Sequence, residues 1–302
     1  MSPQTIRKAV IPAAGLGTRL LPATKVVPKE MMPIGGRPLI QFAVEEAAAS
    51  GLETVVLVVS PNNNLLAEYF HRDRDLENAL LQRGRNEDAE LIRRLSQLAE
   101  VRTVCQQAPL GLADAICSSR PLIHDEPFAV ILPDALIDSA VPCTLQLMEC
   151  YAQHHGCVVA TRNVDSSEVD RFGILDVSPI QNGDIGGRTM KVNALFERPQ
   201  PGSVSSRHGI FGRYILDPEI FGAIERTLPG LNGELQLTDS LSLHMAKAAV
   251  YAYEFEGTHY DAGNKLGFAE ATVAYALQDP EIGPILRKRL ANRACTLATP
   301  VV

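Results

Sequence analysis

The stretch from Lys8 to Pro38 constrains the fold of this 302-residue chain more than any other. It opens with a short apolar run, Lys8 to Pro12, which predicts a first buried strand. The run gives way to Ala13-Ala14-Gly15-Leu16-Gly17, where small side chains and two glycines let backbone N–H groups approach an anion closely. The strand and the turn together predict a place where the backbone can hold an anionic ligand.

Three cations follow this turn, at Arg19, Lys25 and Lys29. A backbone cradle backed by fixed positive charges suits a polyphosphate, because guanidinium and ammonium groups make charge-assisted hydrogen bonds to phosphate. The alternative is a tight strand-to-helix turn with surface lysines. The dinucleotide fingerprint is excluded because a leucine stands where its third glycine belongs, and the P-loop because no Gly-Lys-Ser/Thr follows. The stretch therefore predicts a third kind of nucleotide loop.

The rest of the chain alternates apolar runs with helical patterns. Pro38 to Ser50 has helical spacing and leads to Thr54–Ser60, an apolar run typical of a buried parallel strand. Further strands are predicted at Val101–Val104, Phe128–Asp134, Cys157–Arg162, Val192–Pro199, 208–216 and Val250–Glu256, and helices at Cys143–His154, Gly233–Met245 and Asn264–Leu277. We expect an α/β fold with a Rossmann-like mixed, mainly parallel β-sheet flanked by helices.

Residues 1–278 are predicted to form a single main domain. Within it, residues 62–100 mix both signs of charge with leucines and isoleucines at helical intervals. This pattern indicates one or two exposed amphipathic helices, either a solvated excursion from the sheet or a subunit contact. Residues 279–302 are expected to form a short helix and a polar tail.

Composition narrows the class of function. A net charge of −7 argues against a nucleic-acid-binding surface, although an acidic protein can bind nucleotides where positive charge is concentrated. No stretch approaches the ~18 continuous apolar residues of a membrane span. The six cysteines show no Cys-x-x-Cys spacing and mostly lie in apolar runs. We therefore expect reduced core thiols, rather than disulfides or metal ligands, in a cytoplasmic protein.

The sequence GLGTRLLPATKVVPKEMMPIGGRPLI resembles the signature of sugar-1-phosphate nucleotidylyltransferases. The Pro-Lys-Glu-Met at positions 28–31 is most similar to the bacterial UTP–glucose-1-phosphate uridylyltransferase branch, and the resemblance runs from about Ile6 to about Leu277. It implies a nucleotidyltransferase fold and the Mg²⁺-dependent transfer of UMP from UTP to a hexose 1-phosphate, by default glucose 1-phosphate. The products would be UDP-glucose and pyrophosphate. It also implies a homo-oligomer, a dimer or a tetramer.

Two aspartates are candidate metal ligands. Asp134 ends the most hydrophobic predicted strand, and ligand groups cluster at the carboxyl ends of strands in open α/β sheets. Asp261 precedes a predicted helix. Either residue could instead be an ordinary turn former or helix cap. The resemblance implies that both hold Mg²⁺, and two carboxylates suit a hard, oxygen-binding cation.

The base, the phosphates and the sugar have separate candidates. Gln106 carries a donor and acceptors, as reading the edge of a pyrimidine requires, and Gly111 would let the backbone approach the base or ribose. The resemblance assigns the sugar and its phosphate to Gly173, Glu197 and Arg198. It implies catalytic roles for Arg19 and Lys29, and nucleotide contacts for Ala14, Gly15, Gly17, Glu30, Gln106 and Gly111.

Several positions depart from the family pattern. Gly-Leu-Ala-Asp-Ala stands where uridylyltransferases usually have Gly-Leu-Gly-His-Ala, and the form with Ala113 resembles thymidylyltransferases. Ala135 replaces a frequent second acidic residue, and Arg198 replaces a lysine. These changes leave open a dTTP–glucose-1-phosphate thymidylyltransferase, and also a non-catalytic regulatory paralogue. A nucleotide-binding redox domain is a third alternative. The missing third glycine of the dinucleotide fingerprint argues against it.

Overall fold

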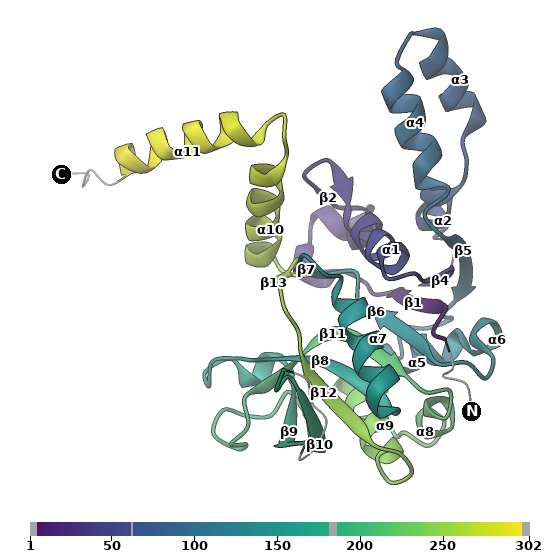
Figure 1. The fold of residues 1–302 in the computed structure, drawn as a ribbon, viewed down its shortest axis with the longest axis vertical. Helices are drawn as coiled ribbons and strands as arrows, with labels where there is room; N and C mark the ends of the chain where they lie inside the picture. Colours follow the sequence, from purple (N-terminus) through teal and green to yellow (C-terminus); the bar gives the residue numbers. More distant parts are fainter. Residues whose placement is uncertain (1–4, 62, 181–185, 298–302) are drawn as a thin grey trace.

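The centre of the molecule is a nine-stranded sheet with the order β5-β4-β1-β6-β11-β8-β12-β10-β9 (Figure 1). The computed structural model describes residues 5–61, 63–180 and 186–297, and the side chains as far as residue 292. The strands of the sheet are β1 (Lys8–Ala13), β4 (Thr54–Val59), β5 (Glu100–Cys105), β6 (Phe128–Ile131), β8 (Cys157–Asn163), β9 (Gly173–Pro179), β10 (Thr189–Glu197), β11 (His208–Leu216) and β12 (Val250–Glu254).

The sheet is mixed, as predicted. β5, β4, β1 and β6 are parallel neighbours, and β8 and β12 are parallel to each other. β11 is antiparallel to β6 and β8, and β10 is antiparallel to β12 and β9. Only β11 and β10 therefore oppose the common direction of these nine strands, which confirms the α/β fold class with its mainly parallel direction.

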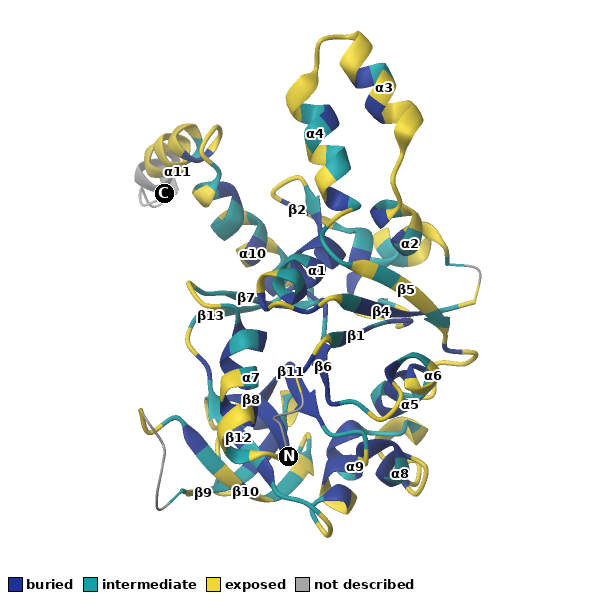
Figure 2. Ribbon diagram, turned by 45° about the vertical axis from the view of Figure 1, so that its right-hand side comes forward, coloured by how far each residue is buried: buried dark blue, intermediate teal, exposed yellow. Residues whose placement is uncertain are grey.

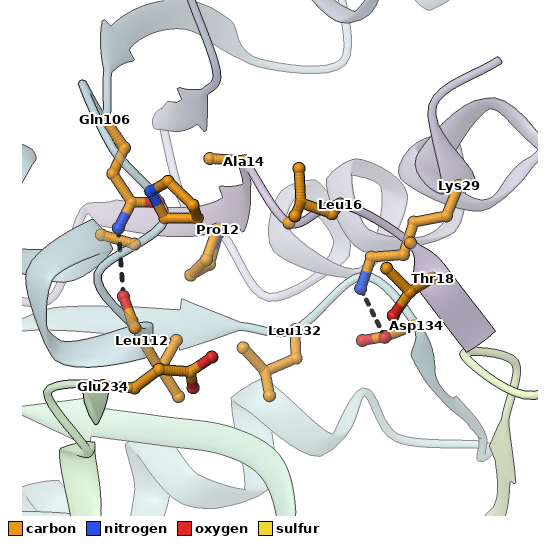
Figure 3. A pocket seen from close by; sticks show the side chains of 15 residues that line it. Pro12, Ala14, Leu16, Thr18, Lys29, Gln106, Leu112, Leu132, Asp134 and Glu234 are labelled. Carbon is orange, nitrogen blue, oxygen red and sulfur yellow. Dashed lines mark hydrogen bonds and ion pairs between the residues drawn. The ribbon is translucent and has the colours of Figure 1, made fainter. Parts of the chain in front are cut away.

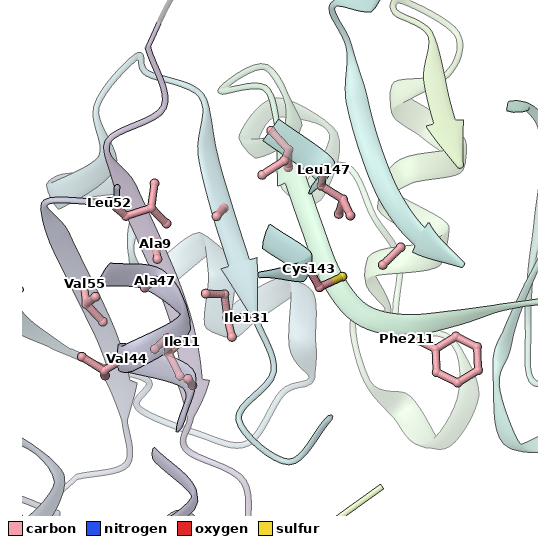
Figure 4. Packing of buried hydrophobic residues seen from close by; sticks show 14 of the residues in the cluster. Ala9, Ile11, Val44, Ala47, Leu52, Val55, Ile131, Cys143, Leu147 and Phe211 are labelled. Carbon is pink, nitrogen blue, oxygen red and sulfur yellow. The ribbon is translucent and has the colours of Figure 1, made fainter. Parts of the chain in front are cut away.

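Successive side chains of a strand point to opposite faces of the sheet. Both faces therefore carry apolar side chains, and helices cover both of them. On one face, Ile11 and Val55 pack with Val44 and Ala47 of helix α1 (Leu39–Ala49), as Figure 4 shows. Helix α7 (Cys143–His154) covers the same face with Leu147. On the other face, Val10 and Val56 belong to a cluster with helices α5 (Leu112–Ser118), α8 (Ile220–Ile224) and α9 (Leu237–His244). Burying each such large apolar side chain contributes roughly 1.5–3 kcal/mol.

A small second sheet lies beside the main one. It pairs β7 (Ala135–Asp138) with β13 (Thr258–Asp261), so that two segments far apart in the sequence run side by side. A further ribbon pairs β2 (Pro33–Ile34) with β3 (Arg37–Pro38). Helix α10 (Lys265–Gln278) follows β13 and packs through Ala271 against Phe42 in a third apolar cluster.

Helical segments protrude from this body (Figure 1). Residues 62–100 contain α2 (Leu65–Phe70), α3 (Arg74–Gln82) and α4 (Asn86–Leu95), one helix more than the sequence predicts. The additional boundary arises where the Asp73 side chain accepts the Leu76 N–H and caps α3. Helix α11 (Gly283–Leu297) projects at the other end of the chain, and both projections are largely exposed (Figure 2). With 15 residues, α11 is longer than the short helix predicted there, and the end of the predicted tail, residues 298–302, lies outside the described residues. None of the helices in the described ranges has the length and apolar character of a membrane span.

Two further predictions about local structure are wrong. The helix expected from Gly233 begins only at Leu237, because Leu235 is held extended by its N–H bond to Leu110 O and by the Ala113 N–H that its own oxygen accepts. Cys105 is exposed at the end of β5, so it is no core thiol, whereas Cys143, Cys150 and Cys157 are buried. The side chain of Cys295 lies outside the described residues.

Candidate active site

The turn after β1 forms the wall of a cavity of about 430 Å³ (Figure 3). Ala14, Gly15 and Gly17 line it together with Lys29 and Asp134. Gly17 has a φ of +62°, and a Cβ there would lie 3.2 Å from the Thr24 side chain, whose hydroxyl donates to Gly17 O at 2.7 Å. Glycine is therefore required for this turn, and the turn brings backbone rather than side chain to the cavity wall.

The small second sheet brings the two candidate metal ligands together. In the β7–β13 register Asp261 lies opposite Ala135, and the Ala262 N–H donates to Asp134 O at 2.8 Å. A Cβ on Gly263 would lie 2.6 Å from Asp134 Oδ2 and 3.1 Å from Asp261 Oδ1. Arg19 Nη2 lies 2.6 Å from the same position, so both carboxylates and this guanidinium surround one point that a side chain at position 263 would fill.

The chemistry of this pair fits a hard divalent cation. Carboxylate oxygens are the ligands that such ions prefer, and an ion bound by only a few protein oxygens can complete its shell with water and phosphate. Asn264 Nδ2 donates to Asp261 Oδ2 at 2.8 Å, which orients that carboxylate. Asn264 also caps α10 through the Gly267 N–H, so the helix-capping role considered for Asp261 belongs to Asn264.

Two of the three predicted cations reach the carboxylates. Lys29 Nζ lies 2.6 Å from Asp134 Oδ2, drawn as a dashed line in Figure 3. Arg19 Nη2 lies 3.7 Å from Asp134 Oδ2, and its Nη1 lies 3.5 Å from Asp261 Oδ2. Lys25 is exposed and lines neither this cavity nor the two neighbouring cavities described below. The expectation that three cations back the turn is therefore wrong for Lys25.

Burial and neighbouring charges shift the pKa values of both Lys29 and Asp134. Burial alone would raise the pKa of Asp134, but the Lys29 ammonium and then Arg19 outweigh it, so the pKa lies below its ordinary value. Burial alone would lower the pKa of Lys29, and the Asp134 and Glu30 carboxylates raise it above its ordinary value. Both groups therefore remain charged at neutral pH, which keeps a cation and an anion poised at the cavity wall.

Glu30 is placed differently from the expectation of a nucleotide contact. Its side chain is 1% exposed, and Oε1 lies 3.9 Å from Lys29 Nζ. The residue lines neither the first cavity nor the two cavities described below. Oε1 has no hydrogen-bond partner among the described residues. Burial raises the pKa of Glu30 to about 7, although Lys29 opposes the shift. Glu30 thus contacts Lys29 from inside the protein, on the side away from the cavity.

Gln106 and Gly111 lie at the far end of the same cavity. Gln106 follows β5, is buried, and donates from Nε2 to Gly111 O at 3.1 Å and to Asp114 Oδ2 at 2.8 Å. Gly111 has a φ of +111°, and a Cβ there would lie 2.6 Å from Leu235 O. Glycine is therefore required here because another segment of backbone packs against it.

The predicted sugar-binding residues line a second cavity of about 270 Å³. Glu197 Oε2 accepts the Thr238 hydroxyl at 2.7 Å, which orients the carboxylate. Arg198 is half-exposed, with Nε 3.5 Å from Glu197 Oε1. A Cβ on Gly173 would lie 2.9 Å from Thr238 Cγ2, so glycine permits this close packing. The structure thus brings Gly173, Glu197 and Arg198 together.

A third cavity, of about 750 Å³, joins the two ends of the site. It shares Gly15, Gly17 and Lys29 with the first cavity and Arg198 with the second. Glu234 lines all three cavities but was not among the site residues predicted from the sequence, which assigned it only to the helix predicted at Gly233–Met245. The site is therefore one long cleft, with the paired carboxylates and cations between the end lined by Gln106 and the smaller, polar second cavity.

Known proteins are similar to this chain over most of its length. The family model described as nucleotidyl transferase matches residues 8–278. UTP–glucose-1-phosphate uridylyltransferase 2 of Staphylococcus saprophyticus is 42% identical over 274 residues, which cover 91% of this chain and 93% of that protein. UTP–glucose-1-phosphate uridylyltransferase of Staphylococcus epidermidis is 40% identical over 93% of this chain and 96% of that protein.

Solved structures are similar over the same length. A UDP-glucose pyrophosphorylase complexed with UDP-glucose superposes with a TM-score of 0.81 at 36% identity, covering 91% of this chain and 100% of that one. A UTP-bound enzyme abbreviated UGPase, from Acinetobacter baumannii, superposes with a TM-score of 0.84 at 33% identity, covering 95% of this chain and 99% of that one. The likeness to these structures therefore extends over nine tenths or more of the chain.

Proposed function

The chain belongs to the nucleotidyl transferase family, and we propose that it transfers UMP from UTP to glucose 1-phosphate, giving UDP-glucose and pyrophosphate. The observation that carries this proposal is the meeting of Asp134 and Asp261 with Lys29 and Arg19 beside the glycine turn. The identities of the nucleotide and the sugar are proposed from the relatives that are named for this reaction.

The reaction is a direct displacement at phosphorus. A phosphate oxygen of glucose 1-phosphate forms a bond to the α-phosphorus of UTP, while the bond from that phosphorus to the bridging oxygen of pyrophosphate breaks. The attacking oxygen is already an anion, so no general base is required. The protein must instead hold two mutually repelling anions in line and stabilise the charge that develops between them.

The cations and the glycine turn bind the two anionic substrates. The backbone of Ala14, Gly15 and Gly17 approaches the triphosphate, and Lys29 and Arg19 neutralise it. Asp134 and Asp261 would hold a divalent cation, for which we propose Mg²⁺ and which would offset phosphate charge when bound. Because Lys29 and Arg19 contact these carboxylates, they also limit the repulsion between the two acids.

The two ends of the cleft select the substrates. Gln106 reads the base, with Gly111 beside it, and Glu197 accepts hexose hydroxyls in the space that Gly173 leaves. Arg198 takes the sugar phosphate. A guanidinium in place of an ammonium retains the charge and binds phosphate as a fork, so we expect binding with altered geometry. Glu30 acts on Lys29 and makes no direct nucleotide contact.

The thymidylyl alternative depends on Ala113. Its side chain is fully buried and lines none of these cavities, and its N–H donates to Leu235 O. Ala113 therefore has no direct contact through which to select dTTP. The regulatory paralogue depends on Asp114, Ala135 and Arg198, none of which disrupts the meeting of Asp134 with Lys29.

A substrate matrix tests the proposal. The purified protein is assayed for pyrophosphate release with each of four nucleoside triphosphates and several sugar 1-phosphates, with and without MgCl₂, and products are identified by chromatography. We expect the highest kcat/KM for UTP with glucose 1-phosphate, and no turnover after chelation. Preference for dTTP would favour the thymidylyltransferase, and UTP binding without product for any sugar would favour the regulatory paralogue.

The proposal includes a cytoplasmic location and a homo-oligomer, dimer or tetramer. The exposed Leu81 and Leu91 of the protruding α3 and α4, and Ile285 and Leu290 of α11, support a contact between copies. Light scattering coupled to gel filtration measures the mass, and a monomer at enzyme concentrations used in assays would contradict it.

A further inference from the structure

Asp114 is the unusual residue in the base-binding part of the cleft. It lies half-buried in the first turn of α5, and its Oδ2 accepts the Gln106 amide at 2.8 Å. Asp114 itself is absent from the residues that line the first cavity, whereas Gln106 and Gly111 line it. Any effect of Asp114 on the ligand is therefore exerted through Gln106.

The two bonds of the Gln106 amide nitrogen fix which way the amide faces. Nε2 carries two hydrogens, and it has two acceptors, Asp114 Oδ2 and Gly111 O at 3.1 Å (the latter bond is drawn in Figure 3). A carboxylate and a backbone carbonyl can only accept, so a rotated amide would place Oε1 against two oxygens. The chemistry of these neighbours, rather than the similar shapes of N and O, assigns the orientation.

The same bonds leave only the carbonyl oxygen of Gln106 for a ligand. No described residue donates to Oε1, and it is not among the fully buried unpartnered atoms. An accessible acceptor without a partner, at the base end of a cleft, favours a base edge that donates there. Uracil and thymine carry N3–H, whereas N3 of cytosine is an acceptor and would face Oε1 with no proton between them.

We infer that Asp114 is a positioning residue that sets base specificity: it holds Gln106 so that Oε1 accepts N3–H, which favours UTP and dTTP and rejects CTP. This inference rests on the proposed function and refines it. A hydrogen bond to a charged acceptor stabilises the donor's position more than a hydrogen bond to a neutral acceptor does. Removing the carboxylate therefore leaves Gly111 O as a weaker restraint on the amide.

The test compares Asp114→Glu, Asp114→Asn and Asp114→Leu with the wild type. We measure kcat/KM for UTP and for CTP at saturating glucose 1-phosphate, and the Kd of each nucleotide by calorimetry. The UTP-to-CTP ratio should fall about tenfold for Asp114→Leu, and less for Asp114→Asn because asparagine can donate or accept. Asp114→Glu, which retains a carboxylate, should keep most of the ratio.

Asp125→Asn, an exposed aspartate outside the cleft, is the matched control and should leave the ratio unchanged. Equal losses for UTP and CTP in the Asn and Leu variants would indicate a merely structural role and would overturn the inference, as would an unchanged ratio. If the wild type turned over neither nucleotide, the proposed function would fail. The calorimetric ratio would then still decide the role of Asp114.

Discussion

Lys29→Ala removes the cation nearest to the paired carboxylates. Lys29 Nζ is 2.6 Å from Asp134 Oδ2, and its side chain is only 18% exposed, so water screens its charge weakly. Loss of one preorganised charge-stabilising donor typically lowers turnover by about 10²–10³-fold, or roughly 3–4 kcal/mol of barrier. Because Arg19 is more distant, at 3.7 Å from the same oxygen, and more than half exposed, we expect it to replace little of this effect.

The assay measures pyrophosphate release at saturating UTP and glucose 1-phosphate, with thermal unfolding as the check that the variant folds. We expect kcat for Lys29→Ala to fall at least about 10²-fold. Lys25→Ala is the matched control, because Lys25 lies on the same loop but is exposed and away from the cleft. We expect it to retain kcat within about a factor of three, or about 0.7 kcal/mol of barrier, because Lys25 lines none of the three cavities.

The division between kcat and KM decides how Lys29 acts. A loss confined to kcat means that the ammonium interacts more strongly with the transition state than with bound UTP. A higher KM with an unchanged kcat would mean uniform binding, and would refute the charge-stabilising role while leaving a binding role. Near-normal kcat/KM in a folded variant would refute both.

Three further predictions concern the carboxylates and the core. Gly263→Ala places a methyl group 2.6 Å from Asp134 Oδ2, so we expect at least a tenfold loss of activity, with Mg²⁺ titration showing weaker apparent affinity. Asp261→Asn should weaken Mg²⁺ dependence similarly and leave calorimetric UTP binding without metal nearly intact; equal losses of both would contradict a ligand role. Glu46→Gln leaves the buried Arg213 without its charge partner and should lower the free energy of unfolding by about 3–5 kcal/mol at pH 7. Burial raises the pKa of Glu46, but Arg213 lowers it more, below the ordinary 4.5, so this stabilisation is present above that pH and is lost as the pH falls through the lower folded value. Urea denaturation should therefore show the difference between wild type and Glu46→Gln shrinking below pH 4.5, and a constant difference would disprove the assignment.

The sequence predicted the elements whose signals are local. The apolar runs of β4 and β6 and the helical spacing of Cys143–His154 fix those elements by their own composition, and α7 has the predicted bounds. Leu235 was assigned to a helix by its neighbours, but bonds to Leu110 and Ala113 from another segment keep it extended. Tertiary contacts of this kind leave no periodic signal in the chain.

The site shows the same division. The glycine turn is readable because Gly17 has the left-handed backbone that its residue type permits. Asp134 and Asp261 meet only through the β7–β13 pairing, which no local pattern predicts, so only the resemblance placed them together. Lys25 and Glu30 flank Lys29 in sequence but face solvent and core respectively, because the irregular loop points each side chain in a different direction.

The buried ion pair between Glu46 and Arg213 supports the segment that carries Asp134, although neither residue lines the cleft. Arg213 is 2% exposed, bonds Glu46 through Nε and Nη2, and donates from Nη1 to Leu132 O at 2.9 Å. The Leu132 N–H in turn donates to Gly212 O, so both polar backbone groups of Leu132, two residues before Asp134, are held by β11. Replacing the pair by apolar residues of similar volume could preserve stability, since buried pairs often contribute little net free energy. It would nevertheless remove the shorter of the two bonds to the Leu132 oxygen and leave only the Ala135 N–H, at 3.2 Å. We expect the Asp134 carboxylate to be held less firmly, so that activity falls more than stability. On this argument the buried charge is retained because it fixes the position of Asp134.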